Sequence, residues 1–542
     1  MIRNMTAVSG LILIFVCVAS VVKCEIFTSL AHMQRSLFAE RDISFRIKNY
    51  VEEEKERLDA LSRLADELDS HSQGALENPD FYLGNPVNAY LFVKRFTIDW
   101  EEHVEGILKW KPNEEFNEKI KQLREYLPTY EDLNGVVAAL LRLQDTYKLD
   151  TEKIAAGDIA GIKTSQLSAV DCFEVGRVAY NDEDYYHTAS WMSEAMNKLE
   201  KEENKTMNKS DIIDYLSFAL YQQGNVGHAL ALTNELLSLV PDHARALNNK
   251  EYFVKMLADS ENEKKKMGDD GSTDLQQDQP IKNVQQVDDY KSSDEFVMYE
   301  RLCRGENTHD YKDKHKLVCR YKTNNHPLLL IAPVKEEEIY LDPYLVVYHN
   351  VISDQEVGVI QSIATPKLGR ATVHNAKTGK LEHATYRISK SAWLRGDDDL
   401  VISRINNRIG AVTGLDMNTA EDLQIANYGI GGHYEPHFDF ARKEESEAFK
   451  GLKTGNRIAT WLSYMSDVEA GGATVFPYIG VKVFPKRGQA AFWYNLHKNG
   501  DGIYNTRHAA CPVLVGTKWV SNKWIHERGQ EFRRPCGLLA DE

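Results

Sequence analysis

The sequence is poor in cysteine, and its few cysteines are not spaced like metal ligands. It has 7 cysteines in 542 residues, and no two of them are separated by two residues. Structural zinc sites commonly use Cys-x-x-Cys pairs, so we expect no zinc site here. Basic residues are also in the minority: 81 acidic residues against 65 basic ones give a formal net charge of −16. This balance argues against nucleic acids and anionic membrane surfaces as partners.

Long apolar runs are absent after the first residues of the chain. No later stretch approaches the ~20 apolar residues that a membrane-spanning helix needs. The run that does occur, residues 11–22, is 12 residues long and follows Arg3. A basic residue before a short apolar core is typical of a signal peptide, so we predict one over residues 1–24, cleaved after Cys24. The alternative is a signal anchor that stays attached to the chain.

Entry into the secretory pathway changes the interpretation of the remaining cysteines, because oxidising compartments favour disulfides. Pairing the cysteines that lie in the same region of the sequence gives Cys303–Cys319 and Cys511–Cys536. Cys172 is then left over, and it lies in a helical pattern where a buried free thiol is expected.

Two N-glycosylation sequons begin at Asn204 and Asn208, within a polar segment that is typical of a loop. In a secretory protein we expect at least one of them to be occupied. The last residues, 538–542, do not form a K-D-E-L-type signal. Retention in the endoplasmic reticulum would therefore need another component.

Residues 25–162 are predicted to form a helical assembly domain. Apolar residues recur mostly three, four or seven positions apart among many charges between residues 33 and 68. This spacing predicts a coiled coil that mediates dimerisation, or else a helix hairpin packed within one subunit. A further helix is predicted over residues 132–147. We find no catalytic constellation in this region.

Residues 163–258 contain a weak internal repeat with an offset of 41 residues, in which residues 178–181 align with 219–222. A tetratricopeptide unit has a period of 34, and the polar loop 202–210 accommodates the excess. The region is therefore predicted to form a short tetratricopeptide-like α-solenoid. Its many aromatic side chains are either core or the lining of a groove for an extended, proline-rich peptide. Residues 259–295 are polar and predict a flexible linker.

Residues 296–542 predict a single domain of antiparallel strands with flanking helices. Many short strand patterns are separated by glycine-rich turns, which is typical of a jelly-roll, or double-stranded β-helix. Helices are predicted over 354–364 and 398–412. Strands are predicted over 328–331, 345–348, 423–428, 458–464, 472–476, 490–493 and 519–524. With the helical regions before it, the protein is expected to be a multidomain α + β chain.

A short motif in this domain carries the clearest chemistry. In a strand, residues two apart share a face, so His437 and Asp439 project together as an imidazole and a carboxylate. His508 follows 69 residues after Asp439, and Lys518 comes ten residues later. Two histidines and one carboxylate, with the opposite positions open, are the ligand set of non-haem Fe(II) oxygenases. A half-buried strand with an incidental polar pair is the alternative reading of the motif alone.

The motifs around these residues are specific in combination. The region from about 423 to 536 resembles the catalytic domain of collagen prolyl 4-hydroxylase α subunits, and the resemblance extends more loosely over the whole mature chain. The motifs that carry it are Asn427-Tyr428-Gly429, His437-Phe438-Asp439, Asn456-Arg457-Ile458-Ala459-Thr460-Trp461, Gly471-Gly472-Ala473-Thr474, Arg507-His508-Ala509-Ala510-Cys511-Pro512-Val513 and the segment from Lys518 to His526.

The resemblance implies a role for each matching residue. His437, Asp439 and His508 would ligate Fe(II), and Lys518 would bind the distal carboxylate of 2-oxoglutarate. Tyr428 and Thr474 would lie beside that carboxylate, and Arg457, Trp524 and His526 near the substrate proline or the cosubstrate. The implied reaction hydroxylates C4 of proline in X-Pro-Gly sequences of procollagen with O2, converts 2-oxoglutarate to succinate and CO2, and depends on L-ascorbate to rescue oxidised iron.

The resemblance also implies a peptide-binding surface and a partner. The matching peptide-binding positions are Tyr215, Tyr221, Arg245, Asn249 and Tyr252, with Phe218 where a tyrosine is usual. Such α subunits pair with protein disulfide isomerase in an alpha2beta2 tetramer, which would supply retention in the lumen of the endoplasmic reticulum. The alternatives are a hydroxylase for lysine or for a non-collagen proline-rich protein, and an inactive peptide-binding chaperone.

Overall fold

The computed structural model describes residues 30–109, 130–266, 280–308, 311–371, 373–374, 381–382, 386–445 and 449–539. The predicted signal peptide lies outside these residues. The chain divides into two compact units, Met1–Gly74 with Glu105–Pro112, and Ala75–Val104 with Asn113–Glu542. Within the described ranges, no helix combines the length and the apolar character that crossing a membrane requires.

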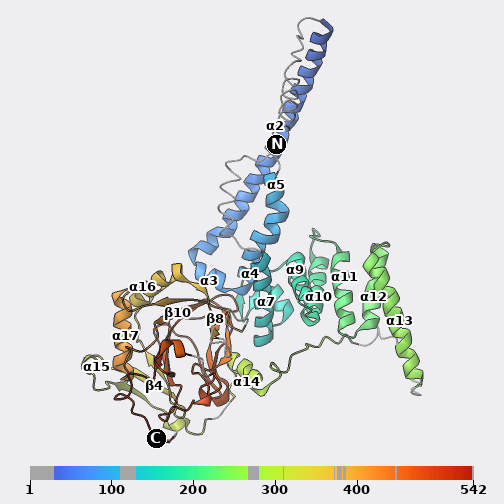
Figure 1. Ribbon diagram of the computed structural model, residues 1–542. Helices are drawn as coiled ribbons and strands as arrows, with labels where there is room; N and C mark the ends of the chain where they lie inside the picture. The colour runs from blue at the N-terminus through green and yellow to red at the C-terminus, as the bar shows by residue number, and fades with distance from the viewer. Residues whose placement is uncertain are drawn as a thin grey trace, which may run out of the picture. The chain divides into compact units, whose positions relative to one another are not determined.

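The first unit consists mainly of helix α2 (Leu30–Glu77), the long blue helix of Figure 1. It contains the predicted helical segment 33–68, which is confirmed as helix. Val51 and Leu58 on it are 43% and 56% exposed, so these apolar side chains are not fully buried by the described residues. Pairing with a second helix as a coiled coil stays a prediction. Short α5 (Glu105–Lys109) also belongs to this unit.

The second unit begins with a small helical core. Proline at the first position and the side chain of Asn85, which accepts hydrogen bonds from two backbone N–H groups, start α4. Tyr90 of α4 and Leu140 of α7 are completely buried in one shared core. The predicted helix 132–147 is confirmed as part of α7. The elements here are α3 (Pro79–Gly84), α4 (Pro86–Lys94), the π-helix η2 (Arg95–Val104), α7 (Tyr130–Tyr147), α8 (Thr151–Ala155) and the hairpin β1 (Asp158–Ile159) and β2 (Ile162–Lys163).

Five helices form the predicted solenoid, drawn in teal to green in Figure 1. Ser168 and Asp171 form a reciprocal capping box that starts the first of them. Trp191 and the free thiol of Cys172 are fully buried in the core, as expected for that cysteine. The repeat predicted from the 41-residue offset corresponds to two helix pairs followed by a last long helix: α9 (Ala169–Asn181), α10 (Tyr185–Lys201), α11 (Lys209–Gln222), α12 (Val226–Leu239) and α13 (Ala244–Lys266).

The described part of the predicted linker is held against the solenoid. Asn225 donates to the carbonyl of Lys282 and accepts from its N–H, both at 2.8 Å. The side chain of Asn283 donates to the carbonyl of Tyr186 at 3.0 Å, and Val284 N–H to the side chain of Gln223. These amide contacts explain why a polar segment without a core of its own follows an ordered path here.

The last part of the chain is built on two antiparallel sheets. The larger sheet has nine strands in the order β3-β4-β5-β16-β12-β19-β10-β9-β6, and the smaller has four in the order β11-β17-β14-β15. The strands are β3 (Cys319–Lys322), β4 (Val334–Tyr340), β5 (Leu345–His349), β6 (Gly369–Arg370), β9 (Lys390–Leu394), β10 (Leu423–Tyr428), β11 (Tyr434–His437), β12 (Arg457–Tyr464), β14 (Thr474–Phe476), β15 (Val481–Val483), β16 (Ala490–Tyr494), β17 (His508–Ala510) and β19 (Lys518–His526). This arrangement confirms the predicted antiparallel oxygenase-type domain.

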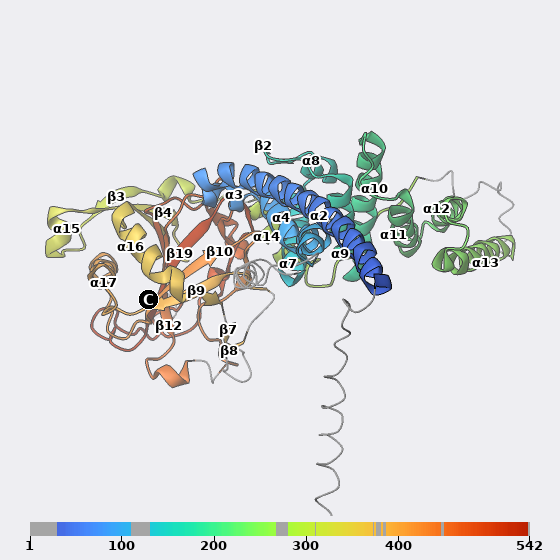
Figure 2. The ribbon, with the colours of Figure 1, turned by 90° about the horizontal axis from the view of Figure 1, so that it is seen from above.

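The two faces of the larger sheet are covered by different elements, helices on one face and the smaller sheet on the other. Helices α16 (Asp354–Ala364) and α17 (Leu400–Thr413) lie beside this sheet (Figure 2). Ile360 of α16 and Ile405 of α17 share a core there with Trp461 of β12. On the other face, Tyr428 and Trp493 share a second core with Phe476 of the smaller sheet. The smaller sheet therefore lies against the larger one, and the candidate site forms between them.

The run 328–331 was expected as a strand, and that prediction is wrong. These residues form the short helix α15 (Pro327–Ile331). His326 caps the helix by accepting a hydrogen bond from Leu328 N–H, and Pro327 occupies the first position. A short apolar run has the same appearance in a strand and in a helix, so the proline was the better guide.

The predicted disulfides are also corrected. Cys303 pairs with Cys511, while Cys319 and Cys536 are free and exposed. Cys303 ends α14 (Asp294–Cys303), whose side chains share a core with Val475 and Ala509. This packing brings the Cα atoms of Cys303 and Cys511 to 5.4 Å, across 208 residues of sequence. Proximity in sequence was therefore a poor guide, because tertiary packing selects the partner.

Candidate active site

The two predicted histidine ligands lie side by side on neighbouring strands of the smaller sheet. β11 and β17 run antiparallel, and His437 is the direct partner of His508. Asp439 follows β11, with Oδ1 at 3.9 Å from His437 Nε2 and Oδ2 at 3.5 Å from His508 Nε2. One ligand atom from each of the three residues lies within 4.8 Å of the others. Strand pairing thus assembles a three-ligand cluster from two distant segments.

Backbone carbonyls fix the orientation of both imidazole rings. His437 Nδ1 lies 2.7 Å from the carbonyl of Glu435, and His508 Nδ1 lies 3.0 Å from that of Thr506. Because a carbonyl only accepts, each Nδ1 carries a proton, and the Nε2 atoms are left as the nitrogens that face Asp439 and could bind a metal. Burial and the neighbouring His508 hold the pKa of His437 well below its usual value, which keeps this ring neutral.

The carboxylate is held in the charged state that a metal ligand requires. Burial alone would raise the pKa of Asp439, but the neighbouring histidines lower it. Thr460 donates to Asp439 Oδ2 at 2.8 Å, and Asn495 donates to Thr460 in turn at 2.9 Å. Two imidazoles that present Nε2 and one supported carboxylate are the ligand set that suits Fe(II).

Lys518 is a buried cation without an acidic partner among the described residues. It stands at the start of β19, directly opposite Tyr428 of β10, and is 1% exposed. Burial lowers the pKa of Lys518 to about 7. Its Nζ lies 5.1 Å from the centre of the Tyr428 ring, and it lines the same cavity as the three ligands and Thr474. A bound carboxylate would supply the missing counter-charge.

Thr474 and Tyr464 form a neutral pair beside this lysine. The hydroxyl of Tyr464 donates to Thr474 Oγ1 at 2.9 Å, and both residues are buried. Thr474 therefore keeps its own hydroxyl proton for another acceptor. Its place in the cavity suits the predicted contact with a carboxylate.

Arg457, Trp524 and His526 are joined by a residue that sequence reasoning missed. Glu421 accepts from Arg457 Nη2 at 2.9 Å and contacts His526 Nε2 at 2.9 Å. Arg457 also donates to the carbonyl of Asp439 at 3.3 Å and lies 3.9 Å from the centre of the Trp524 ring. Burial would raise the pKa of Glu421, but Arg457 and His526 outweigh it and lower that pKa to about 2. No motif marks Glu421 in the sequence.

Two further residues line the cavity without having been predicted. The ring of Tyr434 stacks on His437 with centroids 3.5 Å apart, and the Arg387 guanidinium lies 4.8 Å from the same ring. Arg387 is buried and donates to Gln424 at 3.0 Å. Neither was marked by the sequence: a spacing of three would put Tyr434 and His437 on opposite faces of a regular strand, and nothing distinguishes Arg387. The pairing of β11 is irregular between Tyr434 and His437.

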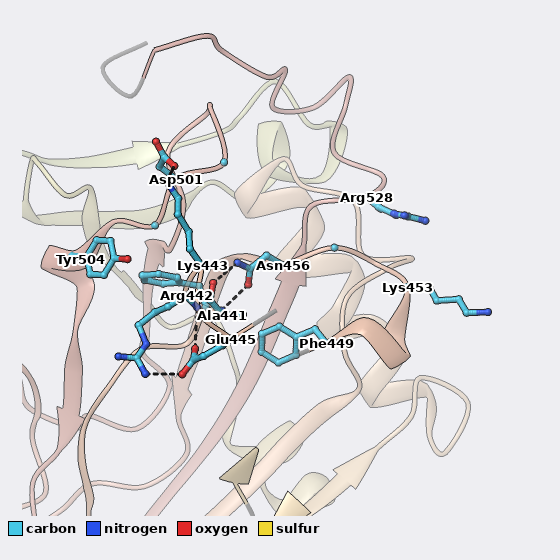
Figure 3. Close-up of a pocket in the computed structure, with 14 residues that line it drawn as sticks. Ala441, Arg442, Lys443, Glu445, Phe449, Lys453, Asn456, Asp501, Tyr504 and Arg528 are labelled. Carbon is cyan, nitrogen blue, oxygen red and sulfur yellow. Dashed lines mark hydrogen bonds and ion pairs between the residues drawn. The ribbon is translucent and has the colours of Figure 1, made fainter. Parts of the chain in front are cut away.

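A second, open recess of about 810 Å³ is lined by other residues (Figure 3). Two of them are neighbours of site residues in the sequence, because Phe440 comes after Asp439 and Asn456 comes before Arg457. In the close-up, Arg442 is paired with Glu445, and Lys453 and Arg528 extend in the same direction without ion pairs to described residues. The other side chains shown include Ala441, Lys443, Phe449, Asp501 and Tyr504.

The six predicted peptide-binding residues gather on α11 and α13. Phe218 lies edge-on to Tyr221, with ring centroids 5.7 Å apart, and Tyr221 donates to the hydroxyl of Tyr252 at 3.3 Å. Tyr252 is 50% exposed. Arg245 Nε donates to Asp214 at 2.9 Å, and the Arg245 guanidinium lies 5.3 Å from the Tyr215 ring centre. The Nδ2 atom of Asn249 is buried and makes no hydrogen bond within the described chain. The result is an aromatic ladder with one unused amide donor.

Asn204 and Asn208 are exposed in the loop between α10 and α11. This placement leaves both side chains accessible, and their glycosylation stays a prediction.

Comparisons with known proteins agree with this architecture. Residues 29–161 match the family "Prolyl 4-Hydroxylase alpha-subunit, N-terminal region", residues 169–259 the "Prolyl 4-hydroxylase peptide-substrate-binding domain", and residues 423–526 the "2OG-Fe(II) oxygenase superfamily". The chain is 49% identical to prolyl 4-hydroxylase subunit alpha-1 of Homo sapiens, over 94% of this chain and 95% of that protein. It is 50% identical to prolyl 4-hydroxylase subunit alpha-2 of Caenorhabditis elegans, over 97% and 96% of the two chains. The chain therefore belongs to the prolyl 4-hydroxylase α-subunit family.

Proposed function

We propose that this protein hydroxylates C4 of proline in X-Pro-Gly sequences of collagen-like chains, with 2-oxoglutarate and O2 as cosubstrates. The observation that carries the proposal is the arrangement of His437, Asp439 and His508 in one cavity with Lys518, which is buried and has no ion pair to any described residue. A three-ligand cluster alone would suit several metals. A lone buried cation beside it selects for a ligand that carries a carboxylate, as 2-oxoglutarate does.

The chain's own residues divide the work between binding and orientation. When bound by the two histidines and Asp439, Fe(II) supplies the redox chemistry that couples 2-oxoglutarate, O2 and a C–H bond. Lys518 binds the distal carboxylate of 2-oxoglutarate, with Tyr428 and Thr474 beside it. Arg457 and Trp524 form a wall next to Asp439 and orient the substrate proline, while Glu421 and His526 hold Arg457 in place.

The aromatic ladder of the solenoid is proposed to bind the polypeptide substrate. A proline-rich chain in the polyproline II conformation is already extended, so it loses little conformational entropy on binding to aromatic side chains. The unused Nδ2 of Asn249 is available to a backbone carbonyl of that chain. Phe218 removes a hydroxyl from the ladder, which makes its middle more apolar. The recess of Figure 3 would accept residues flanking the proline at the catalytic site.

Several finer features of the proposal come from family membership. We propose that protein disulfide isomerase is the partner in an alpha2beta2 tetramer, that the complex acts in the lumen of the endoplasmic reticulum, and that L-ascorbate restores iron oxidised in unproductive turnovers. The exposed apolar residues of α2, such as Leu58, support an assembly role for that helix.

The test is a defined reaction followed by mass spectrometry. The chain is co-expressed with protein disulfide isomerase and given Fe(II), 2-oxoglutarate, ascorbate and a (Pro-Pro-Gly)n peptide. We expect one added oxygen on the proline before glycine, matched by an equal amount of succinate, and no product from the His437→Ala variant. A protein that binds iron and peptide but leaves this peptide unchanged would point to another proline-rich substrate. A protein that binds no iron would leave only the chaperone alternative.

A further inference from the structure

We propose that helix α7 is a strut that positions the iron-ligand strands and ties them to the peptide-binding solenoid. Arg142 and Tyr147 are the positioning residues on the catalytic side of this helix. The inference rests on the proposed function for its activity readout, and on the contacts of α7 for its geometry. Helix α7 lies within residues 29–161, which match the α-subunit N-terminal region. The inference therefore gives this region a role at the active site in addition to its proposed role in assembly.

Two hydrogen bonds connect α7 to the strands that carry the ligands. Arg142 Nη1 donates to the carbonyl of Gly431 at 3.0 Å, and the Tyr147 hydroxyl donates to the carbonyl of Pro512 at 2.6 Å. Gly431 lies just before β11, and Pro512 lies just after β17. Both contacts therefore sit at the same end of the strand pair, and His437 and His508 sit at the other end.

Close packing accompanies these bonds and makes the contact specific. A Cβ atom at Gly431 would meet the Ala139 side chain at 3.0 Å, and one at Gly471 would meet the Tyr147 hydroxyl at 2.5 Å. Only glycine permits the helix to approach so closely at these two points, and both have a positive φ angle. Val515, which follows β17 in the chain, is buried in the same core as α7.

A covalent link lies beside the strut. Arg304 donates to the carbonyl of Thr146 on α7 at 2.9 Å. The neighbouring residue, Cys303, is bonded to Cys511, three residues after the ligand His508. The C-terminal end of α7 is therefore connected to the ligand strand β17 by hydrogen bonds and through a disulfide-bonded neighbour.

The same turn of α7 binds the peptide-binding solenoid with other side chains. Trp191 donates to Gln144 Oε1 at 3.0 Å, in a buried contact. Asp145 Oδ1 lies 3.0 Å from Nε2 of His187, which is fully buried and also contacts Asp184 at 2.6 Å. Burial would lower the pKa of His187, but the two aspartates raise it to about 9, so this ion pair is formed at neutral pH. The six residues from Arg142 to Tyr147 thus join the substrate-binding domain to the ligand strands.

The experiment compares conservative variants on the two sides of the helix. Tyr147→Phe removes one hydroxyl, and Arg142→Met removes the guanidinium but keeps most of the apolar stem. Asn134→Ala, at an exposed position of α7, is the matched control. Each variant is produced as the full chain with its partner subunit. The readouts are thermal unfolding, Fe(II) affinity by competition with a chromogenic chelator, and the ratio of succinate formed to proline hydroxylated.

Tyr147→Phe and Arg142→Met should weaken Fe(II) binding by roughly 10-fold, as loss of support behind metal ligands typically does. They should also raise the ratio of succinate to hydroxyproline, because displaced ligands couple the two half-reactions less well. Asp145→Asn, on the solenoid side, should keep the wild-type Fe(II) affinity while raising KM for long peptides more than for short ones.

Wild-type Fe(II) affinity and coupling in both Tyr147→Phe and Arg142→Met would overturn the inference, even if their unfolding temperatures fall. A purely structural role would lower the unfolding temperature without changing iron affinity in the folded protein. Failure of the wild-type protein to bind Fe(II) or to hydroxylate peptide would instead refute the proposed function, so the two failures are distinguishable.

Discussion

Replacing Lys518 by methionine should stabilise the unloaded protein while it destroys the use of 2-oxoglutarate. Lys518 is 1% exposed and has no acidic partner among the described residues. Lowering its pKa from 10.5 to about 7 corresponds to ~5 kcal/mol of lost folding stability at pH 7 and below, since one pKa unit is worth ~1.4 kcal/mol. Methionine has a similar length and no charge, so it removes this cost without leaving a large cavity.

The sign of the pH dependence follows from the same pKa. Between about pH 7 and pH 10.5 the unfolded lysine is protonated while the folded one is largely neutral, so the folded state binds fewer protons. The free energy of unfolding of the wild type should therefore rise with pH across this window. The Lys518→Met variant should lack that rise, and its advantage should shrink from a few kcal/mol at about pH 7 toward zero at alkaline pH.

The assay is calorimetric unfolding of the wild type and the variant without iron or cosubstrate, at about pH 7 and about pH 9.5. Lys316→Met, at an exposed lysine, is the control for the loss of one surface charge. Adding 2-oxoglutarate with Fe(II) should raise the unfolding temperature of the wild type by mass action and leave that of Lys518→Met much less changed. If the Lys518→Met variant is less stable than the wild type at pH 7, as after an ordinary core substitution, then Lys518 is not an uncompensated buried charge.

Three further predictions concern other parts of the site. The His508→Ala variant should bind Fe(II) too weakly to detect by chelator competition and should give no product. Substantial turnover by this variant would show that His508 is not an iron ligand. Glu421→Gln should lower the free energy of unfolding by ~3–5 kcal/mol, because the largely buried Arg457 loses its charge partner. A loss below ~1 kcal/mol, the usual value for a surface ion pair, would contradict this. Peptide mapping without reduction should recover a peptide that contains Cys303 joined to one that contains Cys511, and a different cross-link would refute the pairing. The Cys303→Ser variant should have a free energy of unfolding lower by ~2–5 kcal/mol.

Residues whose role depends on local geometry could be predicted from the sequence. The alternation of side chains along a strand predicted that His437 and Asp439 lie together, and they do, although β11 ends at His437 and Asp439 lies just after it. Strand boundaries in the oxygenase domain were equally accessible, since β10 occupies residues 423–428 as expected. The run 328–331 failed, because its length and apolar character fit a strand and a short helix equally well.

Residues whose role depends on tertiary packing could not be predicted in this way. Glu421 has no motif, and its function appears only when strand pairing brings Arg457 and His526 to it. The disulfide partner of Cys303 lies 208 residues away, beyond the reach of any pairing by sequence proximity. The strut contacts of Tyr147 are of the same kind, since they join positions 365 residues apart.

If β11 and β17 hold the iron as proposed, their pairing would link iron supply to the lifetime of the protein. These strands are matched at only two positions, Tyr434 with Ala510 and His437 with His508, and the second is also a pair of proposed metal ligands. A metal bound there would act as a cross-link between the strands, so its binding free energy would add to their stability. Under iron starvation the unloaded strands should open more often and expose the chain to proteases. Cells would then lose this protein itself, and not only its activity, when iron is scarce.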